Sequence, residues 1–394
     1  MRTLGVVTVA RSDYGIYLPV LRKIQADPEL RLQLIVSGMH LAPEFGLTVK
    51  AIEADGFEIA DRVEMLVASD TPEAVAKSMG LGLIGFAQSY ARLRPDILLV
   101  LGDRFEMHTA ALAALPFKIP VAHIHGGELT EGAIDDALRH SMTKLSHLHF
   151  VATDEYARRV IQLGEQPWRV TVSGAPSLDN LQTIKLLSVA EIEAKYALCL
   201  NEPPLLVTFH PITLEYEQAE WQVKELLAAL SASARPVLFT LPNADTGGHI
   251  IIRAIREYVK TDASAQMVEN LGTQAYFSLM AIAAAMVGNS SSGIIEAASF
   301  KLPVVNIGTR QRGRVRGENV MDVGYRHEDI IESIKRACSA DFRASLSQMM
   351  NPYGDGTAAD KIITQLKEIV VDERLLVKRF YDMSTASCAM STVD

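Results

Sequence analysis

The sequence has few cysteines and no apolar run long enough to cross a membrane. Its 394 residues include three cysteines, Cys199, Cys338 and Cys388, which lie far apart and form no CxxC pair. This excludes a disulfide framework and a thiolate zinc site, and it suits a reducing compartment. The apolar run at the N-terminus is too short for a signal peptide, and Arg11 and Asp13 follow it directly. We therefore expect a cytoplasmic protein without a membrane span.

Positive charge is also scarce. The chain has 38 lysines and arginines against 47 aspartates and glutamates, a formal net charge of −9. This balance argues against nucleic acid or an anionic membrane as a partner, because such surfaces are bound through a basic face. A phosphorylated small molecule is compatible with it, since a few local cations and helix N-termini suffice.

Common cofactor and metal motifs are missing as well. No GxGxxG follows the first apolar run, and neither GxxxxGK[ST] nor HExxH occurs. The sequence therefore predicts no bound NAD, no P-loop nucleotide and no catalytic metal. We expect a protein that works without a cofactor.

Apolar residues, in contrast, make up 48% of the chain and gather in short runs between helical patterns. Such runs predict strands buried on both faces, as in parallel sheets. One intervening helix is expected from the cap at Asp70-Thr71-Pro72 to Arg94-Pro95. This alternation predicts a doubly wound α/β fold with sites at the carboxyl ends of strands. The expected strands are Thr3–Ala10, Leu32–Ser37, Asp96–Leu101, Pro120–Ile124, His149–Ala152, Val170–Ser173, Leu205–Phe209, Val237–Leu241, Ala285–Gly288 and Pro303–Ile307.

The segment from Gly174 to Pro204 interrupts the alternation. It opens with Gly-Ala-Pro-Ser, holds one expected helix from Val189 to Leu198, and closes with Asn-Glu-Pro-Pro. We interpret it as the junction between two α/β domains, residues 1–180 and 181–371. The last expected helix spans about Ala358 to Val371.

Charged side chains follow one predicted strand, in Leu-Gly-Asp-Arg at 101–104. Asp103 and Arg104 stand where α/β sheets place ligands. Asp103 can instead be a plain cap of the next helix, a role worth about 1 kcal/mol. The tetrapeptide alone leaves both interpretations open.

More acids come after the next strand, in His-Ile-His-Gly-Gly-Glu at 123–128 and Asp-Asp-Ala-Leu-Arg-His at 135–140. Asp135 and Arg139 share a helical face, which an ordinary ion pair would explain. The acids nevertheless accumulate after consecutive strands, whose carboxyl ends are neighbours. This accumulation predicts general acid–base chemistry.

The second half has a loop typical of phosphate binding, at 287–296, with a strand, three serines and a helix start. N–H groups and hydroxyls at a helix N-terminus bind anions, although an ordinary serine cap gives the same pattern. Polar residues also follow two other strands, at His210 and Asn243. Arg11 and Arg310 can clamp phosphate oxygens, with surface arginines as the alternative. We predict a nucleotide-like phosphate ligand held between acids and arginines.

Nine short motifs follow one another in a characteristic order along the chain. They are Val-Ala-Arg-Ser-Asp-Tyr-Gly, Ser-Gly-Met-His-Leu, Leu-Gly-Asp-Arg-Phe-Glu, His-Ile-His-Gly-Gly-Glu, Ile-Asp-Asp-Ala-Leu-Arg-His, Thr-Phe-His-Pro, Pro-Asn-Ala-Asp, Gly-Asn-Ser-Ser-Ser-Gly and Asn-Ile-Gly-Thr-Arg-Gln-Arg-Gly-Arg. Together they resemble the hydrolysing UDP-N-acetylglucosamine 2-epimerases over about residues 3–370.

The resemblance implies a GT-B fold, two Rossmann-like domains with the active site in the cleft between them. It implies that residues 372–394 pack back on the first domain, and that the protein is a homodimer without cofactor or metal. The implied reaction converts UDP-GlcNAc and water to N-acetylmannosamine and UDP, towards sialic acids.

The same resemblance implies a role for each candidate residue. It places Arg11, His210, the loop of Ser290, Ser291 and Gly293, and Arg310 on the UDP pyrophosphate, Glu296 on the ribose and Tyr276 on the uracil. It makes Asp103, Asp135 and Asp136 catalytic, with Arg104, Arg139 and Asn243 lining the sugar side. Some relatives have a catalytic glutamate at the position of His125, so here His125 or Glu128 takes that role.

The implied mechanism is anti elimination of UDP, followed by hydration of the glycal with protonation of C2 from the opposite face. The main alternative is the same reaction on UDP-2,4-diacetamido-2,4,6-trideoxyglucose, on the route to legionaminic acid. A GT-B glycosyltransferase and a non-catalytic UDP-sugar sensor are further alternatives. UDP release without an acceptor distinguishes the epimerase from both.

Overall fold

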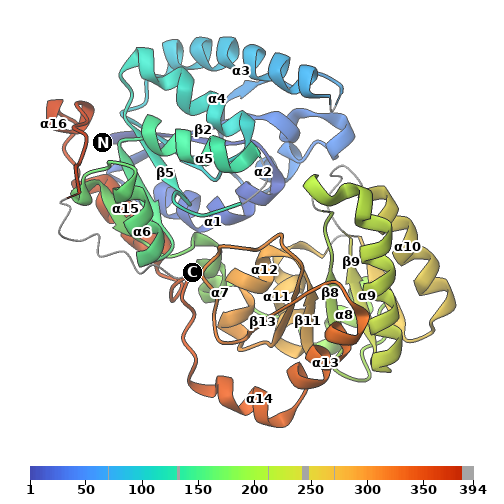
Figure 1. Ribbon diagram of the computed structural model, residues 1–394. Coiled ribbons are helices and arrows are strands. Elements are labelled where there is room, and N and C mark those ends of the chain that lie inside the picture. The colour runs from blue at the N-terminus through green and yellow to red at the C-terminus, as the bar shows by residue number, and fades with distance from the viewer. Residues whose placement is uncertain (70, 131–133, 212, 242–247, 270, 384–394) are drawn as a thin grey trace. The chain divides into compact units, whose positions relative to one another are not determined.

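A computed structural model describes residues 1–69, 71–130, 134–211, 213–241, 248–269 and 271–383 (Figure 1). The chain forms two compact units, each with its own parallel sheet. The first unit contains Met1–Glu128, Ile134–Asp179 and the chain from Gly356 on, and the second contains Leu129–Ala133 and Asn180–Asp355. The boundaries predicted from sequence lie after residues 180 and 371 instead. The chain comes back to the first unit at Gly356, so the helix of residues 358–368 belongs to the first unit and not to the second.

The first sheet has seven parallel strands in the order β3-β2-β1-β4-β5-β6-β7. The strand order reverses between β1 and β4, and ligands of α/β proteins bind at such switch points, beyond the carboxyl ends of the strands. The strands are β1 (Arg2–Thr8), β2 (Leu30–Ser37), β3 (Ile59–Val63), β4 (Ile97–Leu101), β5 (Val121–Ile124), β6 (Leu148–Val151) and β7 (Val170–Val172).

The second sheet repeats this topology with six parallel strands, in the order β10-β9-β8-β11-β12-β13. Its switch point lies between β8 and β11. The strands are β8 (Leu205–Thr208), β9 (Val237–Thr240), β10 (Ala265–Val268), β11 (Ala285–Gly288), β12 (Val304–Ile307) and β13 (Val320–Val323).

Helices cover both sheets. Those of the first unit are α1 (Arg11–Ala26), α2 (Val49–Ala54), α3 (Pro72–Leu93), α4 (Phe105–Ala114), α5 (Ile134–Leu145), α6 (Asp154–Gln162), α15 (Ala358–Glu368) and α16 (Glu373–Leu376). Those of the second are α7 (Asn180–Thr183), α8 (Val189–Tyr196), α9 (Ala219–Ser233), α10 (Gly248–Thr261), α11 (Gly272–Ile282), α12 (Ser291–Ile295), α13 (His327–Ala337) and α14 (Ala340–Ser345).

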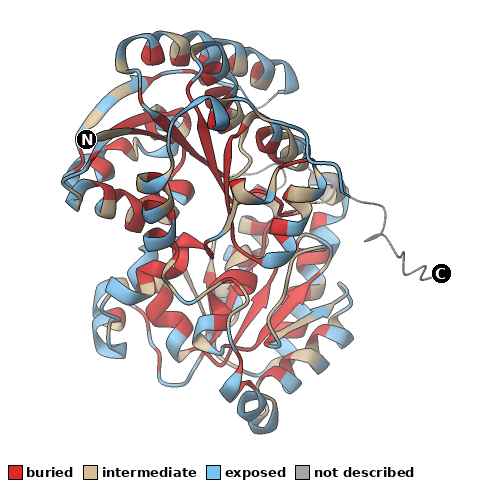
Figure 2. Cartoon of the chain, turned by 90° about the vertical axis from the view of Figure 1, so that its left-hand side faces the viewer, coloured by how far each residue is buried: buried red, intermediate tan, exposed pale blue. Residues whose placement is uncertain are grey.

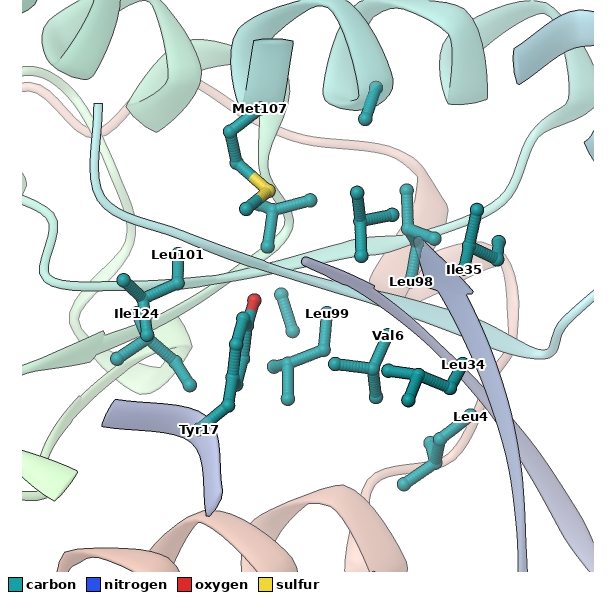
Figure 3. Packing of buried hydrophobic residues seen from close by; sticks show 14 of the residues in the cluster. Leu4, Val6, Tyr17, Leu34, Ile35, Leu98, Leu99, Leu101, Met107 and Ile124 are labelled. Atoms are coloured by element: carbon teal, nitrogen blue, oxygen red, sulfur yellow. The ribbon is translucent and has the colours of Figure 1, made fainter. Parts of the chain in front are cut away.

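Burial follows the layers of each unit. The central strands are buried, and the outward faces of the helices are exposed (Figure 2). In the first unit Val6 and Leu99 of the central strands pack with Tyr17 of α1, and Met107 of α4 packs on the other side of the sheet (Figure 3). Each such large side chain contributes roughly 1.5–3 kcal/mol by leaving water. The core thus fixes the strand ends that carry the candidate residues.

The predicted doubly wound α/β fold is confirmed. Every expected strand is present, with ends that differ by at most two residues. Helix α3 begins after Thr71, whose hydroxyl accepts a hydrogen bond from Ala74 N–H, and it ends before Arg94 as expected. Helix α15 stops at Glu368, earlier than Val371. None of the helices in the described ranges is long and apolar enough to span a bilayer.

Candidate active site

Asp103 sits at the carboxyl end of β4 and is ion-paired with Arg139 of α5. Gly102 takes a positive φ of 76° there, which turns the chain out of the sheet. The N-cap of α4 is Arg104, so the alternative that Asp103 caps this helix is wrong. The carboxylate instead meets a guanidinium that comes from the neighbouring crossover. Arg139 itself is almost entirely buried, with a side chain 4% exposed.

The first turn of α5 brings two more carboxylates to the same group. Asp136 lies 3.9 Å from Arg139 Nη1 and 3.4 Å from His140 Nε2. Burial, and then the charge of Asp103, raise the pKa of Asp135, while Arg104 and Arg139 act in the opposite direction. A raised pKa favours the protonated form of a carboxyl group, which is the form that can donate a proton.

Arg104 forms an ion pair with the carboxylate of Glu106, which is not among the site residues predicted from sequence. Glu106 is fully buried and accepts hydrogen bonds from Arg104 Nε at 3.2 Å and Nη2 at 3.0 Å. This bidentate arrangement fixes the plane of the guanidinium. Glu106 stands in the quoted motif Leu-Gly-Asp-Arg-Phe-Glu, but sequence spacing alone does not show that it turns back towards Arg104.

His125 and Glu128 form a buried pair. Strand β5 ends at Ile124, and His125 follows with a φ of 66°, a strained conformation for a residue other than glycine. His125 Nδ1 lies 2.6 Å from Glu128 Oε1. The other ring nitrogen, Nε2, is buried and has no hydrogen-bond partner among the described residues. An imidazole oriented by a carboxylate, with its second nitrogen available, is the arrangement of a general base.

Arg11 lies just beyond β1, as the first residue of α1, and its side chain is exposed. Asp13, two residues later, accepts hydrogen bonds from the N–H groups of Val9 and Ala10 at 2.8 and 2.7 Å. Burial raises the pKa of Asp13 to about 6 in spite of these bonds. The side chain of Asp13 therefore fixes the turn that presents Arg11.

In the second unit, His210 and Arg310 are joined through Asn289. The side chain of Asn289 accepts a hydrogen bond from His210 N–H at 2.7 Å and donates one to His210 O at 2.9 Å. Arg310 Nη1 and Gln311 Nε2 donate to its backbone carbonyl at 3.0 and 2.9 Å. Asn289 is fully buried and is not among the site residues predicted from sequence, although it stands in the motif Gly-Asn-Ser-Ser-Ser-Gly.

His210 is neutral at physiological pH. Burial, and then the charge of Arg310, lower the pKa of His210 to about 3. Its Nδ1 is buried and has no hydrogen-bond partner among the described residues. A neutral imidazole can donate or accept a hydrogen bond at a ligand, but it contributes no charge.

The serine loop gathers the other candidates of this unit. Ser290 is the N-cap of α12, and its hydroxyl accepts a hydrogen bond from Ser292 N–H at 3.3 Å. Burial raises the pKa of Tyr276 to about 12, whereas side-chain hydrogen bonds with Thr208, Ser292 and Ser290 act in the opposite direction. Glu296, the C-cap of α12, adds a charge near the phenol.

The two remaining loop candidates differ in exposure. Ser291 begins α12 and is partly exposed, whereas Gly293 is buried against Val304. Helix α12 has only five residues, so its dipole is small and the serine cap alone explains part of the pattern. Asn243 lies outside the described residues.

Each unit thus carries its own group of candidates. The first brings together Asp103, Arg104, Asp135, Asp136 and Arg139, together with the pair His125 and Glu128. The second brings together His210, Arg310, Ser290, Tyr276 and Glu296. Across the described ranges, one set of side chains could hold a cation, Glu225, His327 and Glu328, and none of these is a candidate site residue.

The chain is similar to known proteins over most of its length. A sequence profile described as UDP-N-acetylglucosamine 2-epimerase matches residues 22–367. The GDP/UDP-N,N'-diacetylbacillosamine 2-epimerase (hydrolyzing) of Campylobacter jejuni is 39% identical, over 97% of this chain and 99% of its own. The UDP-N,N'-diacetylbacillosamine 2-epimerase (hydrolyzing) of Legionella pneumophila is 35% identical, over 96% and 99%.

The fold is similar to that of a solved relative. The crystal structure of UDP-GlcNAc 2-epimerase from Neisseria meningitidis, bound to UDP-GlcNAc, superposes with a TM-score of 0.80 at 19% identity, over 94% of this chain and 100% of that one. This likeness shows a GT-B-like pair of Rossmann-like domains. With a family profile that spans most of its length, the chain belongs to the UDP-N-acetylglucosamine 2-epimerase family.

Proposed function

We propose that this protein is a hydrolysing 2-epimerase whose substrate is UDP-2,4-diacetamido-2,4,6-trideoxyglucose, that is, UDP-N,N'-diacetylbacillosamine. The observation that carries the substrate is the pair of relatives named for this sugar, which match nearly the whole chain at 39% and 35% identity. They favour the diacetamido sugar over UDP-GlcNAc, the substrate expected first from the sequence. The products are UDP and 2,4-diacetamido-2,4,6-trideoxymannose.

The second unit is proposed to bind UDP. Arg310 and the neutral His210, joined by Asn289, are suited to pyrophosphate oxygens, with Ser290, Ser291 and Gly293 beside them. Arg11 of the first unit is proposed as a further phosphate ligand. Glu296 is proposed to hold the ribose hydroxyls and Tyr276 to pack on the uracil, while Asn243 is proposed to contact the sugar.

The first unit is proposed to perform the elimination. The C2 proton is very weakly acidic, so it leaves together with UDP rather than before it. His125 Nε2 takes the C2 proton, the C–H electron pair forms the C1–C2 double bond, and UDP departs with the electrons of C1–O. Glu128 accepts the Nδ1 hydrogen bond and stabilises the imidazolium that forms. Cations on the pyrophosphate stabilise the leaving group.

Hydration of the glycal completes the reaction. A proton is added to C2 from the face opposite His125, and water adds its oxygen to C1, which gives the manno configuration. The remaining water proton and the proton held by His125 pass to the solvent, and the donor to C2 takes its proton back from the solvent. Asp135 is proposed as the proton donor, because it lies in the first turn of α5, where burial and the charge of Asp103 raise its pKa. Asp103 and Asp136 are proposed to stabilise the positive charge that develops at C1, with Arg104 and Arg139 contacting the sugar. No oxidant and no metal is needed for this balance of atoms.

The substrate is tested by side-by-side turnover. We expect UDP release in water from the diacetamido sugar with a kcat/KM roughly 100-fold higher than from UDP-GlcNAc, the scale at which a pocket discriminates by the size of one small group. A higher kcat/KM for UDP-GlcNAc would overturn the substrate but keep the reaction. UDP release that requires an acceptor would show a glycosyltransferase, and tight UDP binding without turnover would show a sensor.

A further inference from the structure

Helix α5 carries Asp135, Asp136 and Arg139, yet little apolar packing fixes its position. Met142 is its one buried apolar side chain, and Leu145 is only partly buried. The polar contacts of the helix therefore matter more than usual. Arg139, in the middle of the helix, is ion-paired with Asp103. The C-terminal end has a partner from a remote part of the chain.

Lys378 caps the C-terminal end of α5. Its Nζ donates hydrogen bonds to the carbonyl oxygens of Thr143 at 3.3 Å, Lys144 at 2.9 Å and Ser146. The last carbonyls of a helix have no partner within it, and a cation there also interacts favourably with the helix dipole. One ammonium group thus contacts three carbonyl oxygens at the end of the helix that presents the acids.

A buried carboxylate completes this cap. Glu165 is 1% exposed and lies 2.8 Å from Lys378 Nζ, 2.6 Å from Lys144 Nζ and 3.1 Å from His149 Nε2. Burial disfavours its charge, but the hydrogen bonds from His149, Lys144 and Lys378 outweigh this and lower the pKa of Glu165 to about 2. Glu165 is therefore ionised, and it offsets the cost of burying Lys378.

The segment that carries Lys378 is fixed independently of α5. We name residues 372–383 the C-terminal strap. Arg169 is fully buried and donates hydrogen bonds to the carbonyl oxygens of Arg374, Leu375 and Val377 at 2.8, 2.9 and 3.2 Å. Beyond Lys378, Tyr381 N–H donates to Gly164 O at 2.9 Å. The strap is thus held on both sides of Lys378, so the lysine can fix α5 rather than follow it.

We infer that Lys378 is a positioning residue for the reaction: from the C-terminal strap it holds helix α5, and with it Asp135 and Arg139, in the place that the chemistry requires. The inference rests on the proposed function of α5. It gives the C-terminal strap a part in turnover rather than in stability alone.

The test compares Lys378→Met with Lys378→Arg in the full chain. A misplaced catalytic group loses up to about 100-fold in rate, so we expect Lys378→Met to lower kcat roughly 10- to 100-fold. The Kd of UDP should stay within about twofold, because the proposed UDP ligands lie elsewhere. Lys378→Arg keeps a cation with several donors and should restore kcat to within roughly threefold of the wild type. Amide hydrogen exchange of α5 should be faster in Lys378→Met only.

Lys367→Met is the matched control. Lys367 lies on α15 and pairs with Asp27 at 2.8 Å and Glu29 at 2.5 Å, so its loss also removes a lysine ion pair from the C-terminal region. It should leave kcat and the exchange of α5 unchanged. If Lys378→Met does not fold, Lys378→Gln replaces it, with the same direction of change.

Each result decides the inference. An unchanged kcat in folded Lys378→Met or Lys378→Gln overturns it, as does an equal loss in Lys367→Met. If the wild type releases UDP from no sugar, the proposed function fails. The inference is then judged on the exchange of α5, where unchanged protection in the variant overturns it.

Discussion

The pair of His125 and Glu128 gives the sharpest prediction about catalysis. Glu128→Gln keeps an oxygen that can accept the Nδ1 hydrogen bond, now 2.6 Å long, but removes the charge. A hydrogen bond to a charged group contributes about 1.5–3 kcal/mol and a neutral one about 1 kcal/mol. The loss of roughly 0.5–2 kcal/mol lowers kcat by about 2- to 30-fold. His125→Gln removes the base itself and should cost about 10²- to 10⁴-fold.

The double variant separates the two roles. If Glu128 acts only through His125, adding Glu128→Gln to His125→Gln changes kcat little further. The assay is steady-state UDP release at saturating substrate, with the Kd of UDP as the control for binding. A larger loss in Glu128→Gln than in His125→Gln, or losses that multiply, would refute our assignment and make Glu128 the base.

Three further predictions concern the UDP-binding unit and assembly. A Cβ on Gly288, where φ is 135°, would lie 2.0 Å from Thr208 O, so Gly288→Ala should lower the unfolding free energy by at least about 3 kcal/mol. Gly324 has open space around it, so the control Gly324→Ala should cost under about 0.5 kcal/mol. Similar melting curves for the two variants would contradict this. Because the pKa of His210 lies at about 3, the ratio of the UDP Kd values of wild-type and His210→Gln proteins should stay constant from pH 8 to pH 5. If UDP binding became tighter towards pH 5 in the wild type only, this histidine would be gaining a charge, which would contradict the prediction. We propose a homodimer that forms through α3, where the apolar side chains of Ile84 and Leu81 are 60% and 49% exposed. Light scattering should give a dimer for the wild type and a monomer for Ile84→Glu. A wild-type monomer would contradict the proposal.

The sequence predicts the central strands of both sheets but not three of the edge strands. Strands β3, β10 and β13 contain Asp61, Arg62, Gln266 and Asp322, so they lack the continuous apolar pattern of a strand buried on both faces. Their exposed sides tolerate polar residues. Pattern alone therefore finds the strands that build the core and misses those that border it.

The candidate site divides in the same way. The positions of Asp103, His210 and Arg310 follow from the rule that ligands bind beyond strand ends, which sequence can apply. The partners do not follow from spacing. Arg139 turns to Asp103 on another element, Glu106 turns back to Arg104, and Asn289 joins two strand ends. Such contacts depend on side-chain direction and on crossovers, which only the folded chain defines.

The most direct test of the proposed reaction is the fate of hydrogen at C2. The protein is incubated with UDP-N,N'-diacetylbacillosamine in D₂O without any acceptor, and the released sugar is examined by NMR and mass spectrometry. We predict stoichiometric UDP and a 2,4-diacetamido-2,4,6-trideoxymannose that carries one deuterium at C2, because the C2–H bond is broken and remade with solvent. A product that retains protium at C2, or a sugar released with the gluco configuration, would contradict elimination and hydration as the reaction of this protein.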